Sequence, residues 1–177
     1  MIRITGGVNR SRLLETPSVS TTKPTMDKVR AGVFSALGPS VEGAKVLDLF
    51  AGSGSYGFEA LSRGASHVTF VDLSPVSVDI IKKNAASLKE ENVTIIQDDV
   101  LSFLEQNPQE FSIIFVDPPY KLDIYENVVK MLIRRNLLSN NAIIVLESEK
   151  ELNIDETLFS KVKLYKYGLA KVYILRK

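Results

Sequence analysis

The sequence contains no cysteine and only one histidine, His67. The residues required for disulfide-stabilised folds and for zinc sites built on cysteine or histidine are therefore absent or scarce. The same holds for nucleophiles that need a cysteine or a serine–histidine pair. We expect no bound metal, and we interpret His67, which begins an apolar segment, as structural. The chemistry of this chain has to come from carboxylates, amides, backbone groups and aromatic rings.

Long apolar segments are also absent. No run reaches the roughly eighteen apolar residues that cross a membrane, and the N-terminus lacks the charged-then-apolar order of a signal peptide. With 177 residues, 45% of them hydrophobic, the chain can bury one core. We expect one catalytic unit in the cytoplasm, with the monomer as the favoured state and no membrane partner.

The net charge of +1 conceals an uneven distribution along the chain. Residues 1–30 carry +4, residues 31–160 carry −9 and residues 161–177 carry +6. Clustered Lys and Arg favour an anionic partner such as RNA, because they release counterions from phosphates. Solvated charge on two short hairpins explains the same counts equally well.

The first part of the chain differs in pattern from the rest. Residues 2–14 predict a β-hairpin with a break at Gly6-Gly7, followed by a Ser/Thr/Pro loop at 17–22. Residues 24–37 have helical spacing of apolar side chains, which ends at Gly38-Pro39. We assign residues 1–24 to an N-terminal hairpin arm and residues 25–177 to a catalytic domain.

From Lys45 onward, predicted strands and helices alternate. The strands are expected at residues 45–50, 67–72, 93–97, 111–116 and 142–147, with helices at 56–63, 75–88, 101–105 and 124–135. This alternation predicts an α/β, Rossmann-like fold in which helices cover both faces of a parallel sheet. Two last strands, at 162–167 and 169–175, would add an antiparallel hairpin and complete a mostly parallel sheet of seven strands.

A glycine-rich loop joins the first strand of this sheet to its first helix, where a parallel sheet opens a ligand crevice. It reads Asp48-Leu49-Phe50-Ala51-Gly52-Ser53-Gly54-Ser55-Tyr56-Gly57. Asp72 ends the next strand, where a carboxylate can accept hydrogen bonds from both hydroxyls of a ribose. We predict a nucleoside site formed by Phe50, Ala51, Gly52, Ser53, Gly54, Asp72 and Leu73.

The same loop matches the Gly-x-Gly-x-x-Gly pattern of dinucleotide-binding proteins, which alone is weak evidence. Asp48 argues against that interpretation, because a carboxylate near the loop is unfavourable for a pyrophosphate. No second domain remains to hold a hydride acceptor. S-adenosylmethionine carries a sulfonium and an ammonium, so acidic surroundings suit it. We predict this cofactor, with Asp48 near its positive charges.

Asp98-Asp99-Val100 follow the third strand of the sheet. A carboxylate there can accept a hydrogen bond from the adenine amino group while the Val100 amide meets a ring nitrogen. We favour Asp99 over Asp98 for this contact. Capping of the next helix by Asp99 is the alternative, and the two roles are compatible.

The strongest signal is Asp117-Pro118-Pro119-Tyr120, which follows the fully apolar strand segment 113–116. An exocyclic amino group on a purine is a poor nucleophile, because its lone pair is delocalised into the ring. Asp117 and the Pro118 carbonyl can accept both of its hydrogens and aim the lone pair at a methyl donor. The prolines Pro118 and Pro119 stiffen the segment, and Tyr120 offers a ring for stacking the base.

With these motifs the chain resembles the amino-methyltransferases that carry a D-P-P-Y motif and, more closely, the RsmD family of 16S rRNA guanine-N2 methyltransferases. The matching positions fall in the hairpin, the first helix, the glycine loop with its helix, and the last motif: Arg3, Gly6, Gly7, Arg10, Arg12, Leu13, Pro24, Thr25, Asp27, Val29, Arg30, Phe34, residues 48–54, 59–65, Asp72 and residues 115–120. The hairpin and the first helix are the more particular of these segments, and they carry the substrate assignment.

The resemblance implies methylation of N2 of the guanine numbered 966 in 16S rRNA, on an assembling small ribosomal subunit. Separately, Arg3, Arg10 and Arg12 fall on a hairpin too short for a core of its own and Arg30 in the first turns of the next helix, so we expect these four basic residues to bind RNA. Three rivals remain: an adenine-N6 DNA or RNA methyltransferase, a glutamine-N5 protein methyltransferase and a non-enzymatic RNA-binding protein. The first normally needs a target-recognition domain, the second prefers Asn at position 117, and the intact D-P-P-Y argues against the third.

Overall fold

The computed structural model describes residues 1–17, 24–119 and 121–177. Five parallel strands form the body of the sheet, as predicted: β3 (Lys45–Leu49), β4 (His67–Asp72), β5 (Val93–Gln97), β6 (Phe111–Val116) and β7 (Leu138–Ser148). β7 is longer than the expected 142–147, because Leu138 pairs with Phe111 before the register shifts. The sequence therefore predicted every parallel strand but underestimated the length of β7.

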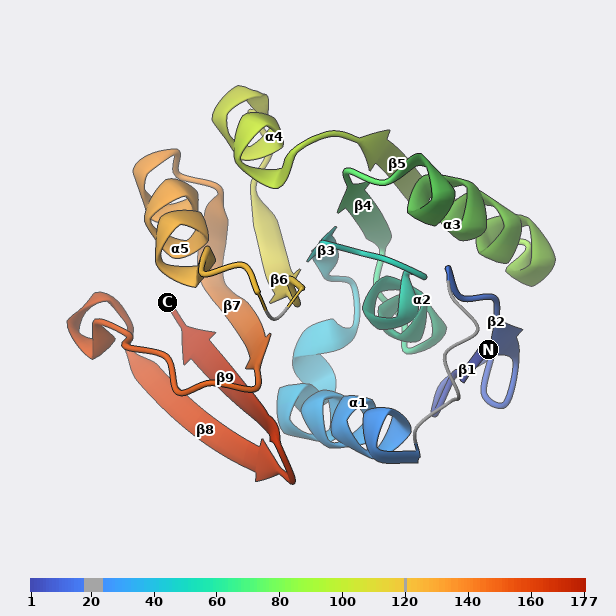
Figure 1. Cartoon of the computed structure of the whole chain (residues 1–177), viewed down its shortest axis with the longest axis horizontal. Helices are drawn as coiled ribbons and strands as arrows, with labels where there is room; N and C mark the ends of the chain where they lie inside the picture. The colour runs from blue at the N-terminus through green and yellow to red at the C-terminus, as the bar shows by residue number, and fades with distance from the viewer. Residues whose placement is uncertain (18–23, 120) are drawn as a thin grey trace.

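The C-terminal hairpin completes the sheet. β8 (Lys161–Tyr167) and β9 (Ala170–Arg176) pair antiparallel, and β9 also pairs antiparallel with β7. The strand order is β5-β4-β3-β6-β7-β9-β8 (Figure 1). The expected seven-stranded, mostly parallel sheet is confirmed.

Helices cover both faces of this sheet: α1 (Pro24–Leu37), α2 (Ser55–Ser62), α3 (Pro75–Leu88), α4 (Val100–Gln106) and α5 (Tyr125–Arg134), with short 3-10 helices η1 (Gly38–Val41) and η2 (Glu156–Leu158). Alternation along β6 separates two apolar clusters, since successive side chains point to opposite faces. Ile113 and Phe115 pack in the cluster that holds residues of α1, α2 and α3, whereas Ile114 and Val116 pack with residues of α4 and α5.

The N-terminal hairpin consists of β1 (Ile2–Arg3) and β2 (Leu13–Leu14), which pair antiparallel. Its apolar side chains Ile4 and Leu14 are each only 1% exposed and belong to the same cluster as α1 and α2. The Thr5 amide and hydroxyl donate to the Glu59 carboxylate of α2 at 2.8 and 2.7 Å. The hairpin is present as predicted, and it packs firmly against the helical layer beside α1 and α2 (Figure 1).

The order of the strands places the site. From β3 the chain proceeds outward through β4 to β5, then crosses back to β6 on the other side of β3. Between β3 and β6 the direction of the connections reverses, and the carboxyl ends of strands at such a switch point flank a crevice. Among the described residues, no helix is long and apolar enough to span a membrane.

Candidate functional site

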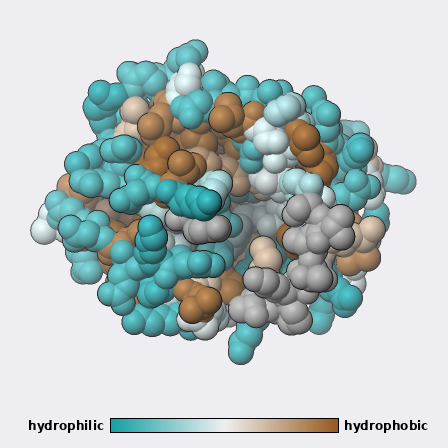
Figure 2. Space-filling model, in the orientation of Figure 1, coloured by the Kyte–Doolittle hydropathy of each residue, from teal (hydrophilic) through white to brown (hydrophobic). Residues whose placement is uncertain are grey.

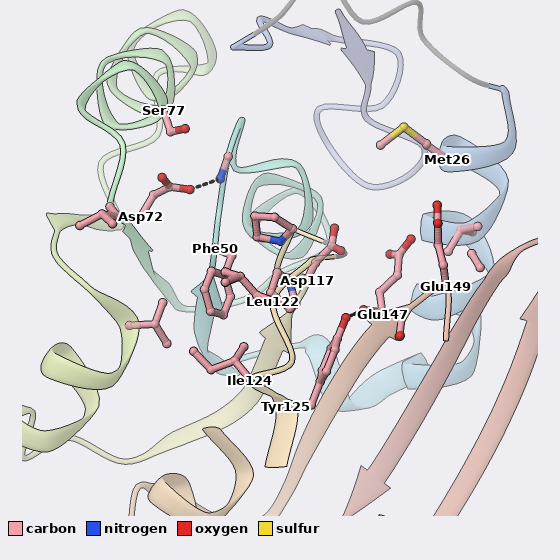
Figure 3. Close-up of a pocket in the computed structure, with 18 of the residues that line it drawn as sticks. Met26, Phe50, Asp72, Ser77, Asp117, Leu122, Ile124, Tyr125, Glu147 and Glu149 are labelled. Atoms are coloured by element: carbon pink, nitrogen blue, oxygen red, sulfur yellow. Dashed lines mark hydrogen bonds between the residues drawn. The ribbon is translucent and has the colours of Figure 1, made fainter. Parts of the chain in front are cut away.

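A cavity of about 1140 Å³ opens at the carboxyl ends of the parallel strands (Figure 3). Its lining comes from the glycine loop, the ends of β4, β6 and β7, the first turns of α1, α3, α4 and α5, and the β8–β9 turn. Figure 2 shows this face of the molecule hollowed near its centre, within a mainly hydrophilic periphery. The cavity is large enough for a nucleoside-sized cofactor together with a base.

The glycine loop approaches the cavity through Phe50 and Gly52, which both line it. Phe50, Gly52 and Gly54 all have positive φ, at 58°, 56° and 76°, so the backbone turns sharply between β3 and α2. Ala51, Ser53 and Gly54 are buried and lie outside the cavity lining. The Ser53 carbonyl instead accepts a hydrogen bond at 3.0 Å from Asn84 of α3, which fixes the loop from behind.

Asp48 lies behind the loop and does not line the cavity. It is 3% exposed, and its Oδ2 accepts a hydrogen bond from the Gly57 amide at 2.9 Å. Burial raises the pKa of Asp48 to about 8, and the Asp72 charge adds to the rise, whereas the Gly57 amide opposes it. The expectation that Asp48 faces the cofactor is therefore corrected: this carboxyl holds the first turn of α2 against β3.

Asp72 takes the predicted position at the end of β4, where it lines the cavity (Figure 3). Its Oδ2 accepts from the Gly52 amide and its Oδ1 from the Ser74 amide, each at 2.8 Å. A carboxylate oxygen has a second lone pair, so both oxygens can still accept a hydroxyl. Leu73, 67% exposed, lines the cavity next to it.

Asp99 and Val100 also line the cavity, at the start of α4. Asp99 caps this helix, since its Oδ1 accepts from the Ser102 amide at 3.0 Å. The capping role considered from the sequence is thus confirmed, and the adenine contact of Asp99 stays a prediction. Asp98 accepts from the Asp99 amide and lies outside the lining.

Asp117 emerges from the end of β6 into the cavity, followed by Pro118 and Pro119, which also line it. By solvent-accessible surface Asp117 is exposed, and its side chain faces the cavity. Desolvation raises the pKa of Asp117 well above its usual value, and the nearby charges of Glu147 and Asp48 raise it further. A carboxyl group poised in this way suits hydrogen-bond acceptance and proton uptake. Tyr120, the last residue of the predicted motif, lies outside the described residues.

Sequence reasoning missed Glu147, which lies near the end of β7 and lines the same cavity. The Tyr56 hydroxyl donates to Glu147 Oε2 at 2.5 Å, and the Tyr125 hydroxyl donates to the Glu147 backbone carbonyl at 2.7 Å. Burial raises the pKa of Glu147, while the Tyr56 hydrogen bond and the Arg30 charge lower it. The sequence contains a signal for Glu147, because it is an acid near the end of an apolar parallel strand. Asp72 and Asp117 were identified from the same kind of position.

The four arginines predicted to contact RNA separate into two groups. Arg3, Arg10 and Arg12 are exposed on the N-terminal hairpin, although an Arg12 guanidinium nitrogen donates to the Ser87 carbonyl at 2.8 Å. Arg30 is only 3% exposed and forms ion pairs with Asp27 at 2.8 Å and with Glu59 at 3.3 Å. The prediction for Arg30 is wrong, because a buried guanidinium with two carboxylate partners has no face left for RNA.

No group of three or more side chains able to hold a metal occurs within residues 1–17, 24–119 and 121–177. The polar groups around the cavity are carboxylates, backbone amides and hydroxyls. They can bind a nucleoside at one end of the cavity and an amino-bearing group at Asp117.

Comparison with known proteins extends this picture. A family model described as "Conserved hypothetical protein 95" matches residues 2–176. Ribosomal RNA small subunit methyltransferase D of Escherichia coli K12 is 39% identical over 150 residues, which cover 85% of this chain and 76% of that protein. The solved structure of the putative methyltransferase yhhF from Escherichia coli matches with a TM-score of 0.85 and 33% identity, over 99% of this chain and 97% of that one.

A Thermus thermophilus enzyme is also similar. It is described as a 16S rRNA N2 G1207 methyltransferase, RsmC, in complex with AdoMet and guanosine. Its TM-score is 0.75 at 25% identity, and the match covers 90% of this chain and 44% of that one.

The Rossmann-like sheet, the glycine loop after β3 and the Asp-Pro-Pro segment after β6 define a methyltransferase of the S-adenosylmethionine-dependent class. The family model spans nearly the whole chain, and the Escherichia coli relative agrees with it. The chain belongs to the RsmD family. The resemblance noted in the sequence is confirmed.

Proposed function

We propose that this protein transfers the methyl group of S-adenosylmethionine to the exocyclic N2 of a guanine in 16S rRNA. The observation that carries the proposal is the shared cavity: Asp117, Pro118 and Pro119 line one part of it, and Gly52 and Asp72 line another. The family relatives that are named as rRNA small subunit methyltransferases support RNA as the substrate. Guanine 966 follows from the family resemblance.

The residues present fit this cofactor. Asp72 would accept the two ribose hydroxyls, Asp99 the adenine amino group, and the Val100 amide would donate to an adenine ring nitrogen. Phe50 and Gly52 would border the remainder of the cofactor, and Ala51, Ser53 and Gly54 would support these two residues from behind. When bound, S-adenosylmethionine supplies an electrophilic methyl group on a sulfonium.

The acceptor nitrogen is positioned by the segment after β6. Asp117 and the Pro118 carbonyl would accept the two N–H hydrogens of N2, which turns the nitrogen lone pair toward the methyl donor. The raised pKa of Asp117 suits it to take up the proton that the nitrogen releases. Tyr120 would stack on the base. Pro119 lines the cavity.

The RNA would be held outside the cavity by basic residues. Arg3, Arg10 and Arg12 are exposed on the hairpin arm, whose boundary we propose at residue 24. We propose an assembling small ribosomal subunit as the substrate and a monomer as the active form.

Methyl transfer from tritiated S-adenosylmethionine tests the substrate class. The acceptors are naked 16S rRNA, small subunits that lack the modification, duplex DNA and a release factor, each with the wild type and with Asp117→Ala. We expect transfer to rRNA or to small subunits alone, and none by the variant. Transfer to DNA or to the release factor in place of RNA would overturn the proposal.

A further inference from the structure

Glu147 and Asp117 follow paired residues on neighbouring parallel strands. Val116 of β6 pairs with Leu146 of β7, so the next residue on each strand reaches the same edge of the sheet. Both side chains line the cavity, and they lie close together in Figure 3. The carboxylates of Glu147 and Asp117 therefore both face the part of the cavity in which the target base would bind.

The Glu147 side chain is held in one orientation. The Tyr56 hydroxyl donates to Oε2, and the Tyr56 ring stacks on Phe115 with centroids 4.7 Å apart. The Tyr125 hydroxyl fixes the backbone carbonyl of the same residue. No hydrogen bond from a described residue reaches the second oxygen, Oε1. An acceptor is thus presented beside Asp117 by a rigid aromatic support.

Guanine has a donor arrangement that matches two adjacent acceptors. Its Watson–Crick edge carries N1–H next to the N2 amino group, whereas adenine has an unprotonated, accepting N1. A carboxylate opposite an adenine N1 would be left without a donor, and leaving a charged acceptor unpaired is costly. Enzymes that modify an extruded base commonly read it through this edge.

We propose that Glu147 accepts the N1–H of the target guanine while Asp117 accepts from N2, so that Glu147 selects guanine over bases with an unprotonated N1. The assignment rests on the proposed function and adds a specificity-determining residue to it. Burial raises the pKa of Glu147, whereas the Tyr56 hydrogen bond and the charge of the buried Arg30, which forms an ion pair with Glu59, oppose this rise.

Glu147→Gln separates this role from a structural one. The glutamine carbonyl can still accept from the Tyr56 hydroxyl, so the support is retained. Its NH₂ group then occupies the position of Oε1 and offers a donor where the wild type offers an acceptor. A base with an accepting N1 should gain from this exchange.

The substrates are small subunits reconstituted with 16S rRNA that carries guanine or 2-aminopurine at the methylated position. 2-Aminopurine keeps the N2 amino group but has an accepting N1. We expect the wild type to prefer guanine by about 100-fold in kcat/KM, and Glu147→Gln to reduce this preference at least tenfold. The missing O6 of 2-aminopurine affects both enzymes alike, so the change in preference reports N1. Glu151→Gln, which removes an exposed charge nearby, should keep the wild-type preference.

Equal losses on both substrates in Glu147→Gln would overturn the assignment, since they would indicate only a structural role. Should the variant fail to fold, the wild type alone decides, because comparable rates on guanine and 2-aminopurine would also overturn it. A wild type that leaves guanine N2 unmethylated refutes the proposed function itself, which is a different result.

Discussion

Asp117 and Asp72 both end parallel strands, yet their surroundings prepare them for different tasks. Asp72 accepts two backbone amides and is fixed in place beside the glycine loop. Asp117 faces the cavity with the charge of Glu147 beside it, and its pKa is raised. One carboxylate is suited to hold a neutral ribose, and the other to bind and deprotonate an amino group.

Replacement of Asp117 by Ala should therefore reduce turnover by at least about 100-fold, because the acceptor nitrogen loses its orientation. Cofactor affinity should stay within about twofold, since this side chain does not hold the nucleoside. Single-turnover kinetics and titration calorimetry measure the two effects, with Asp123→Ala, an exposed carboxylate later in the same β6–α5 connection, as a control. Turnover within tenfold of the wild type contradicts the role given to Asp117.

Replacement of Asp72 by Ala should have the opposite profile. The loss of two ribose hydrogen bonds should weaken cofactor binding by about 1–3 kcal/mol. Asp79→Ala, on the exposed face of α3, should leave binding unchanged. A dissociation constant that does not move in the Asp72 variant would exclude a ribose contact.

At the scale of elements, a buried network of charges joins the N-terminal hairpin, α1 and α2. Glu59 of α2 is fully buried and accepts hydrogen bonds from Arg30 of α1, from Arg63 and from Thr5 of the hairpin. The Arg30 guanidinium also donates to the Arg3 carbonyl. Since α2 begins at the glycine loop, this network supports the end of the cavity that the glycine loop lines.

We expect Glu59→Gln to lower the free energy of unfolding by about 3–5 kcal/mol, because the buried Arg30 keeps only one of its two carboxylate partners and Arg63 loses its ion pair. Urea denaturation measures the loss. Glu126→Gln removes an exposed ion pair with Lys130 and should cost no more than about 1 kcal/mol. Similar small losses in both variants would show that the network contributes little.

Elements with strong periodicity were predictable from the sequence, and long-range pairs were not. Apolar runs and turn residues placed the parallel strands, but the start of β7 was missed because Asn140 and Asn141 interrupt its apolar pattern, and Asn141 has a φ of 60°. Arg30 was assigned to the surface because its partner Glu59 lies 29 residues away in the sequence. The position of Asp48 behind the loop depends on the fold of that loop, which the motif alone does not specify.

On the scale of the whole molecule, basic charge sits on two hairpins around an acidic body. The N-terminal hairpin packs on the helical layer of α1 and α2, and the turn of the C-terminal hairpin lines the cavity through Tyr167, Gly168 and Leu169. An RNA that reaches the cavity would pass the C-terminal turn, while the arm can hold its backbone further out.

Replacement of Arg10 and Arg12 by Ala should weaken RNA binding and flatten its salt dependence. Each lost phosphate contact should reduce the slope of log affinity against log salt by roughly 0.7 to 0.9. Folding and cofactor affinity should hardly change, because exposed charges contribute little to stability. Filter binding at several salt concentrations measures the slope.

The matched control is the pair Arg134 and Arg135, which are exposed on or directly after α5, over the other face of the sheet. Their replacement by Ala should leave affinity and slope near the wild-type values. An unchanged slope in the Arg10 and Arg12 variant would instead assign the RNA surface to the C-terminal hairpin, with Lys161, Lys163, Lys166 and Lys171.

The chemical identity of the product tests the proposed function most directly. Small subunits from cells that lack this protein are incubated with it and S-adenosylmethionine, and the 16S rRNA is digested to nucleosides for mass spectrometry. We expect one new methylated nucleoside, N2-methylguanosine, absent when Asp117→Ala replaces the wild type. A methyl group on adenine, on another guanine atom or on ribose, or no methylated nucleoside at all, would contradict it.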